Sequence, residues 1–166
     1  MAKSVIIFAS ALCFLSLLGF AYCETPRLFV EGKVYCDTCR TQFVTRVTEY
    51  MKGAKVRLEC RDNEGGSVTY SAEAETDASG TYRIPVDGDH EEEICEIQLV
   101  KSSSPDCSEV SNDPYNKLSA RVSITSNNGI ASPVRQANPL GFLKKEPLPE
   151  CSEVLRELGI TAEGLV

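Results

Sequence analysis

The chain has 166 residues and a formal net charge of −7 at pH 7, since 24 Asp and Glu side chains outnumber 17 Lys and Arg. This length suits one ordinary domain. The acidic balance argues against binding nucleic acid through a phosphate-neutralising surface, and it would repel the chain from anionic membranes. We therefore expect no nucleic-acid partner and no insertion into a membrane.

The first 23 residues have the layout of a secretory signal peptide. A basic start at Lys3 precedes the apolar run 5–18, which is too short for a comfortable membrane span. Small residues suited to a cleavage site follow. We place the signal peptide at 1–23 and a single β domain at 24–166, and we expect an exported, soluble monomer in the extracellular space or the cell wall.

The number of cysteines supports export. Of eight cysteines, Cys13 and Cys23 lie within the expected signal peptide. Cleavage after Ala21 would leave Cys23 as an odd seventh thiol, whereas cleavage after Cys23 leaves an even set of six, and parity favours the second position. Six cysteines in an exported domain imply three disulfides, although sequence alone allows fifteen pairings. The six are Cys36, Cys39, Cys60, Cys95, Cys107 and Cys151.

Alternation of apolar and polar residues dominates the chain after the signal peptide. Each alternating run has one apolar and one polar face, which is typical of half-buried antiparallel strands. The glycine-containing segments 62–66, 77–80 and 127–129 supply residues where a hairpin needs a positive φ. Short strands at these intervals predict an all-β sandwich or barrel with antiparallel sheets. In chain order, we expect strands at 28–35, 54–60, 68–74, 82–86, 95–99 and 118–124.

Two segments do not follow this alternation. In 41–52 the apolar residues fit helical spacing, but several of them also fit a strand, so the segment stays unassigned. Near the C-terminus, 149–159 predicts a short helix, because apolar residues recur at helical spacing and Gly159 stands just past its end. A disulfide at Cys151 would hold this helix on the β domain.

Cys60 and Cys95 both fall on the apolar faces of their expected strands. Their side chains are therefore expected to point into the same core. A bridge between them would close a loop of about 35 residues, which is worth roughly 4 kcal/mol in the chain-entropy model. That value is comparable with the whole net stability of a modest domain.

Residues 31–40, with the sequence EGKVYCDTCR, resemble the signature of the pollen Ole e I family. The likeness continues through 53–60, 94–99 and 138–151, and so covers nearly the whole chain after the signal peptide. The resemblance implies a secreted β-barrel or sandwich with three disulfides. It also implies a function in pollen hydration, germination or tube growth, and several members of the family are allergens. Transferred by cysteine order, the family's pairing implies the disulfides Cys36–Cys107, Cys39–Cys151 and Cys60–Cys95.

The chain also has a weaker likeness to other β modules, and it departs from the pollen family in one respect. Residues 53–56 together with 76–82 are similar to transthyretin-like and carboxypeptidase-regulatory modules, which implies an immunoglobulin-like or transthyretin-like topology. Many members of the pollen family are N-glycosylated, but no asparagine here lies in an Asn-x-Ser/Thr motif. Behaviour that depends on a glycan is therefore not expected of this chain.

The pair Cys36 and Cys39 also has the spacing of a redox or zinc site. Redox chemistry needs a thiolate at a helix N-terminus in a βαβ unit, whereas this pair follows a strand in an all-β pattern. Zinc needs four N or S ligands, and the chain has one histidine. We therefore interpret both residues as structural disulfide cysteines.

That histidine, His90, lies in the acidic segment 87–93. Its acidic neighbours would favour the protonated ring and weaken it as the base of a Ser-His-Asp arrangement. We interpret the segment as a solvated turn, with weak calcium binding by its carboxylates as the minor alternative. No carboxylate pair is marked out for glycoside hydrolysis. The sequence predicts no catalytic residue, no cofactor and no metal site.

The leading functional hypothesis is a non-enzymatic extracellular protein that binds a receptor-like protein or a cell-wall component. Loops on a rigid scaffold are the usual place for such contacts, and we expect them at 61–67, 87–93 and 101–114. The alternative is a carrier of a small ligand or wall polysaccharide, which would need an incompletely filled barrel interior.

Overall fold

The computed structural model describes residues 28–62, 66–88, 90–111, 119–125, 129, 132–161 and 164–165. The expected signal peptide and most of the turn expected at 127–129 lie outside these ranges. Within them, no helix is long and apolar enough to cross a membrane.

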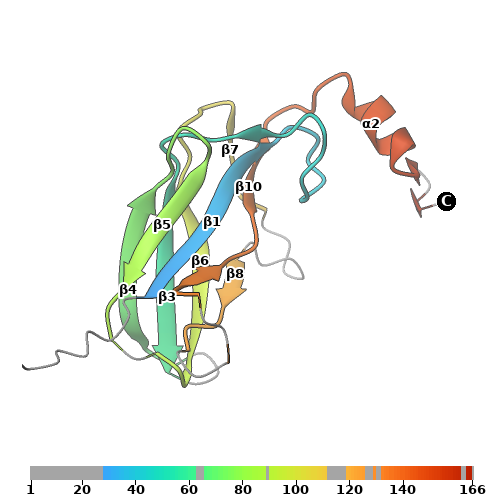
Figure 1. Ribbon diagram of the computed structural model, residues 1–166. Helices are drawn as coiled ribbons and strands as arrows, with labels where there is room; N and C mark the ends of the chain where they lie inside the picture. The colour runs from blue at the N-terminus through green and yellow to red at the C-terminus, as the bar shows by residue number, and fades with distance from the viewer. Residues whose placement is uncertain are drawn as a thin grey trace, which may run out of the picture.

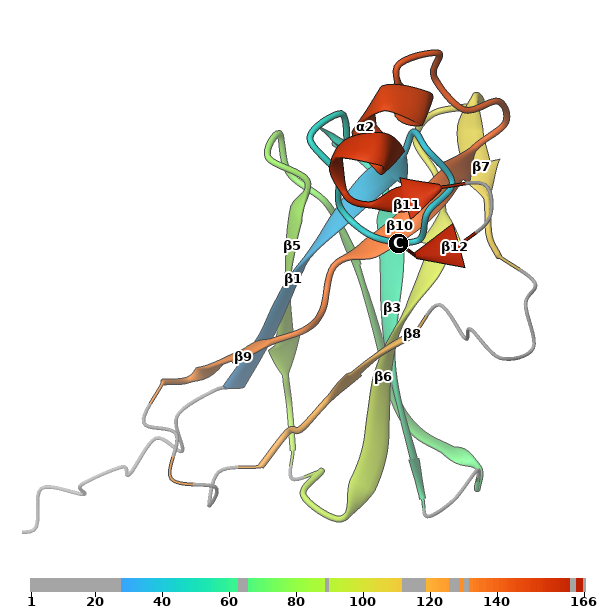
Figure 2. The same cartoon turned by 90° about the vertical axis from the view of Figure 1, so that its right-hand side faces the viewer.

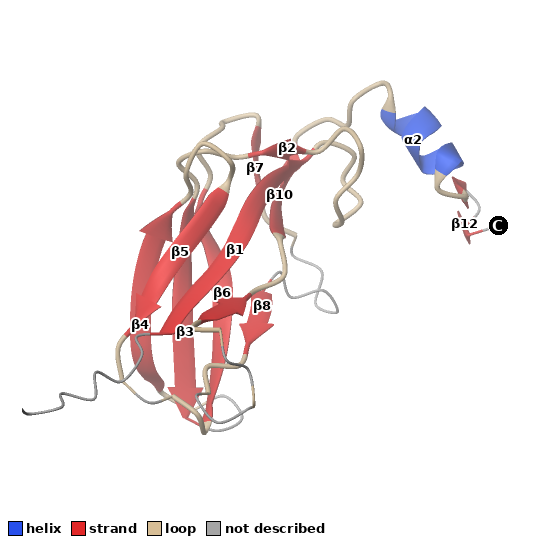
Figure 3. Ribbon diagram, in the orientation of Figure 1, coloured by secondary structure: helices blue, strands red, loops and turns tan. Residues whose placement is uncertain are grey.

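Two β-sheets face each other and enclose the hydrophobic core (Figures 1 and 3). The first sheet contains β1 (Leu28–Asp37), β2 (Glu49–Tyr50), β5 (Thr81–Val86), β7 (Cys107–Glu109), β9 (Val134–Gln136) and β10 (Leu140–Lys144). The second sheet has the order β4 (Val68–Glu75), β3 (Lys55–Asp62), β6 (Glu93–Lys101) and β8 (Ser119–Val122). The expected all-β sandwich is confirmed.

The C-terminal part of the chain forms α2 (Cys151–Glu157) and the hairpin of β11 (Ile160–Thr161) and β12 (Gly164–Leu165). These elements project from one end of the sandwich (Figures 1 and 2). The expected short helix is therefore present, and Gly159 follows it with φ of 72°. A left-handed residue just past a helix is where glycine is favoured.

β1 is the central strand of the first sheet. It pairs antiparallel with β5 and β2, and parallel with β9 and β10. The two parallel pairs depart from the expected antiparallel sheets. A parallel pair needs a long connection, and most of the domain lies between β1 and β10 in the sequence. In the second sheet, the pairs formed by β3 with β4 and β6 and by β6 with β8 are antiparallel.

The predicted alternation sets the core. On β3, Val56, Leu58 and Cys60 are fully buried between the sheets, whereas the residues that alternate with them face outward. β5 and β6 follow the same pattern, although β6 extends to Lys101. Of the strand predicted at 118–124, the described residues form only β8, Ser119–Val122. The largest fully buried side chains are those of Tyr82, Phe142, Leu58, Ile84, Ile97, Val30, Val34 and Val56.

The segment 41–52 is neither a helix nor a long strand. It is a loop that ends in the two-residue strand β2, which pairs with Tyr35 and Cys36 of β1. Residues 40 and 42 have positive φ, although neither is glycine. The sequence pattern could not show this path, because the loop is fixed by contacts with distant residues.

Candidate functional site

Three disulfides join the six cysteines. Cys36–Cys107 links β1 to β7, Cys39–Cys151 links the chain after β1 to α2, and Cys60–Cys95 joins directly opposed residues of β3 and β6. All six side chains are buried. Because Cys36 and Cys39 are bonded to different partners, they form no dithiol pair and offer no thiolate to a metal.

Two of these disulfides lie at the start of the loop 38–48, here called the cystine loop, and its end leads into β2, which pairs with β1. The buried side chain of Asp37, which is 1% exposed, organises it. The Asp37 carboxylate accepts hydrogen bonds from the backbone N–H groups of Cys39 (3.2 Å) and Gln42 (2.5 Å). The Thr38 hydroxyl closes the loop by donating to the carbonyl of Val47 at 2.9 Å. These contacts satisfy backbone groups that the left-handed residues would otherwise leave unpaired.

The cystine loop is also tied to three neighbouring elements. The Arg40 guanidinium donates to the Glu109 carboxylate of β7 at 2.7 Å and to the Lys144 carbonyl of β10 at 2.6 Å. The Arg46 guanidinium donates to the Glu157 carboxylate of α2 at 2.9 Å. Figure 2 shows the loop and α2 together at this end of the sandwich.

Three apolar side chains on and beside this loop face solvent. Phe43, Val44 and Tyr50 are 39%, 43% and 45% exposed. Large apolar side chains held outward on a fixed loop are typical of surfaces that bind proteins. We call Phe43, Val44 and Tyr50 the apolar tip. Sequence reasoning missed it, because the spacing of these residues fitted both a helix and a strand.

The three loops predicted for presentation do not converge on one site. Residues 61–67 and 87–93 lie at the same end of the second sheet, where Asp62 pairs with Glu93. The segment 101–114 instead begins at the opposite end and contains β7, which Cys107 bonds to β1. The residues 63–65, 89 and 112–114 lie outside the described ranges. Only the segment 101–114 shares an end of the sandwich with the apolar tip.

The outer face of the second sheet carries a charged network. Arg57 pairs with Glu73 of β4 at 2.7 Å and with Glu59 at 3.4 Å, and Arg61 pairs with Glu59 at 2.9 Å. On the other side, Arg121 of β8 pairs with Glu96 of β6 at 3.1 Å. Charges that are paired with one another in this way favour a solvated face rather than a binding site.

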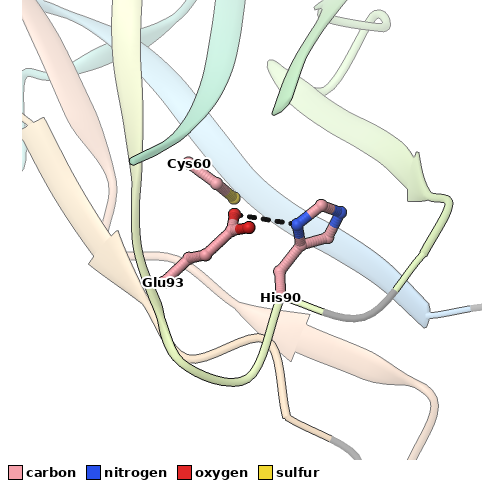
Figure 4. A group of neighbouring side chains, drawn as sticks. All are labelled: Cys60, His90 and Glu93. Carbon is pink, nitrogen blue, oxygen red and sulfur yellow. Dashed lines mark hydrogen bonds and ion pairs between the residues drawn. The ribbon is translucent and has the colours of Figure 1, made fainter. Parts of the chain in front are cut away.

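His90 lies in a compact cluster with Cys60 and Glu93 (Figure 4). Glu93 pairs with Asp62, so the cluster is at the end of the second sheet opposite to Lys55 and Lys101. Its Nδ1 is 2.9 Å from Oε2 of Glu93, and its Nε2 is 2.9 Å from the backbone carbonyl oxygen of Asp87. The ring packs on Tyr70 of β4 with 4.5 Å between ring centroids. The Thr69 hydroxyl, which donates to Glu93 at 2.6 Å, and the His90 ring lower the pKa of Glu93.

The expectation of a solvated turn is wrong for His90, which is only 8% exposed. The ring can be buried because both of its nitrogens have partners and Tyr70 covers one face. Those same contacts leave neither nitrogen available as a base for a serine. Cys60 also lies in this cluster, but its sulfur is bonded to Cys95 and is not a thiolate ligand.

Comparisons with known proteins agree with this fold. Residues 26–159 match the family described as "Pollen protein Ole e 1 like". The chain is 72% identical to an "Olee1-like protein" of Betula pendula, over 100% of this chain and 99% of that one. It is 48% identical to the "Anther-specific protein LAT52" of Solanum lycopersicum, over 96% and 97% of the two chains.

A solved structure supports the same assignment. The crystal structure of the major plantain pollen allergen Pla l 1 superposes with a TM-score of 0.68 at 41% identity, covering 75% of this chain and 99% of that one. At this identity the likeness extends beyond the fold alone. The chain belongs to the Ole e 1 like family of pollen proteins.

Proposed function

We propose that this protein is an exported, non-enzymatic protein that acts in pollen by binding a macromolecule of the cell surface or cell wall. Three disulfides suit an oxidising compartment outside the cytosol. The sequence layout of residues 1–23 supports export. The names of relatives, among them a pollen allergen, an anther-specific protein and a pollen-specific protein, support the pollen setting.

The observation that carries the proposal is the apolar tip on a loop fixed at both ends. The start of the loop is held by Cys36, which is bonded to β7, and by Cys39, which is bonded to α2, and its end is held by β2, which pairs with β1. The Asp37 carboxylate fixes the backbone at Cys39 and Gln42, near the start of the loop. A loop held in one conformation loses little conformational entropy on binding, so its exposed apolar side chains contribute more to affinity.

The chemistry of the described residues supports a binding role over an enzymatic one. The cysteines are engaged in disulfides, and both nitrogens of the single histidine have acceptors. The charged face of the second sheet is self-paired. The apolar tip places three exposed large apolar side chains on and beside one fixed loop, which favours it as the protein-binding site.

A binding experiment tests this assignment with a matched control. Labelled protein is titrated against purified plant cell-surface ectodomains and against cell-wall preparations from germinating pollen. We expect saturable binding that unlabelled protein displaces, and a loss of about tenfold or more in affinity for the double variant F43S/V44S. The control is Val68→Ser on β4, because Val68 is 45% exposed but lies at the other end of the sandwich.

Two results would count against the proposal in different ways. Equal affinity of F43S/V44S and wild type would remove the apolar tip as the binding surface. Absence of saturable binding to every ectodomain and wall preparation would remove the binding function itself.

A further inference from the structure

The two ring nitrogens of His90 both face hydrogen-bond acceptors. Nδ1 faces the Glu93 carboxylate and Nε2 faces the backbone carbonyl of Asp87. A neutral imidazole carries one N–H, whereas an imidazolium carries two. The low pKa of Glu93 keeps its carboxylate an acceptor in mildly acidic solution. Both contacts can therefore be hydrogen bonds only when the His90 ring is protonated.

The surroundings make the loss of either bond costly. His90 is 8% exposed, so water reaches the ring poorly. The Tyr70 ring packs against the His90 ring. The Tyr70 hydroxyl donates to the carbonyl of Pro85 at 3.2 Å, and this hydrogen bond holds Tyr70 in position beside His90. Gly88, with φ of 97°, turns the chain so that the Asp87 carbonyl reaches Nε2. A buried nitrogen facing a carbonyl without a proton between them is unfavourable.

The charged groups around the ring are acidic. On β6 the contact is the Glu93 carboxylate, and within the turn Asp87, Glu91 and Glu92 are exposed carboxylates. From β4 the facing groups are the Thr69 hydroxyl and the Tyr70 phenol. From β3 the contribution is Cys60, whose sulfur is uncharged in its disulfide. This environment suits a positive charge on the ring.

We propose that the protonated ring of His90 locks the described part of the turn between β5 and β6, residues 87–88 and 90–92, against the sandwich, and that loss of this proton releases it. A histidine changes its charge between about pH 5 and about pH 8. Glu93 sets the lowest pH at which the turn stays locked. The pKa of Glu93 is lowered in the folded protein. The hydrogen bonds that its carboxylate accepts are therefore fully present above the ordinary carboxyl pKa, and they are lost as the pH falls through the lowered pKa.

The chain has one histidine, which makes the test direct. The ring ¹⁵N chemical shifts of His90 are measured by NMR in the full-length folded protein from pH 5 to pH 8. Amide-exchange protection factors, corrected for the intrinsic pH dependence of exchange, are measured over the same range. We expect two protonated ring nitrogens at pH 5. We also expect the turn amides to lose protection by roughly tenfold to hundredfold as the ring titrates, which is the range for hydrogen bonds to charged groups.

Two variants and an internal reference separate the lock from a general effect of pH. The H90Q variant should show turn protection that is low and independent of pH. E91Q removes an exposed carboxylate of the same turn and should keep the wild-type dependence. Amides of β3 should stay protected throughout. A neutral ring at pH 5, or turn protection in the wild type that does not change as the ring titrates, would overturn the proposal even if H90Q fails to fold.

Discussion

The ring of Tyr82 lies across Gly32, its cross-strand partner on β1. A methyl group at position 32 would overlap the Tyr82 hydroxyl and approach its ring carbon Cζ within 2.7 Å. The same arrangement recurs on the neighbouring strand pair, where the Tyr35 ring covers Gly141. Each glycine therefore provides the space into which a buried tyrosine packs.

The first prediction tests this packing. Gly32→Ala should lower the free energy of unfolding by roughly 1–3 kcal/mol, because the added methyl group overpacks a buried site. The Tyr82 hydroxyl has no hydrogen-bond partner among the described residues, so Y82F alone should cost less than about 1 kcal/mol. Denaturant unfolding of both single variants and of G32A/Y82F measures the coupling. Additive losses in the double variant would show that the two side chains do not compete for the same space.

A second prediction concerns Asp37. Asp37→Ala should lower the free energy of unfolding by roughly 1.5–3 kcal/mol, because it leaves two backbone N–H groups of the cystine loop without their charged acceptor. D37N keeps one carbonyl acceptor and should fall between the wild type and D37A. The unfolding midpoints in urea check the order, and an unchanged midpoint for D37A would contradict the anchoring role.

Much of this fold could be predicted from the alternation of residues on β3, β5 and β6, because one face of each strand is buried against the other sheet. The C-terminal helix followed from apolar spacing and Gly159. The parallel pairing of β1 with β10 could not be predicted, because no local pattern records which distant strands meet.

The parts that escaped prediction depend on tertiary contacts. The cystine loop bends at Arg40 and Gln42, and these residues gave no turn signal because a buried aspartate, rather than glycine, stabilises the bend. His90 stands among acidic residues that indicated a solvated turn. Its burial depends on Tyr70, which comes from a different strand and is 20 positions away in the chain.

The third prediction addresses the attachment of α2. The disulfide Cys39–Cys151 and the ion pair between Arg46 and Glu157 join the helix to the cystine loop. C39S/C151S should raise amide exchange across Cys151–Glu157 to near the level of an unfolded segment, since a seven-residue helix is not stable alone. Amides of β3 and β6 should remain protected. Wild-type protection of the helix in this variant would mean that the packing of Val154 and the Arg46–Glu157 ion pair hold it in place without the disulfide.

A fourth prediction concerns alkaline pH. Burial, with smaller contributions from Asp37 and Tyr50, raises the pKa of Tyr35 to about 12 from an ordinary value of 10.0. The folded state thus favours the neutral phenol. Its contribution to stability is complete below about pH 10 and is lost as the pH rises from there to about 12. Burial raises the pKa of Tyr82 as well.

Phenolate absorbance followed together with circular dichroism measures this loss. Tyrosines that titrate late should ionise as the β signal disappears, and Y35F should remove one phenolate from that late step. A late step of unchanged size in Y35F would show that Tyr35 ionises before the protein unfolds.

The fifth prediction places the start of the exported chain at Glu24. Cleavage after Cys23 leaves six cysteines, all of them bonded in the structure, and a thiol reagent should therefore find no free thiol in the unfolded mature protein. Cleavage after Ala21 would leave the thiol of Cys23. The variant Cys23→Ser distinguishes the two positions by intact mass. If the cut follows residue 23, the mature variant and the mature wild type have the same mass, whereas a mass difference would place the cut upstream and add one reactive thiol to the wild type.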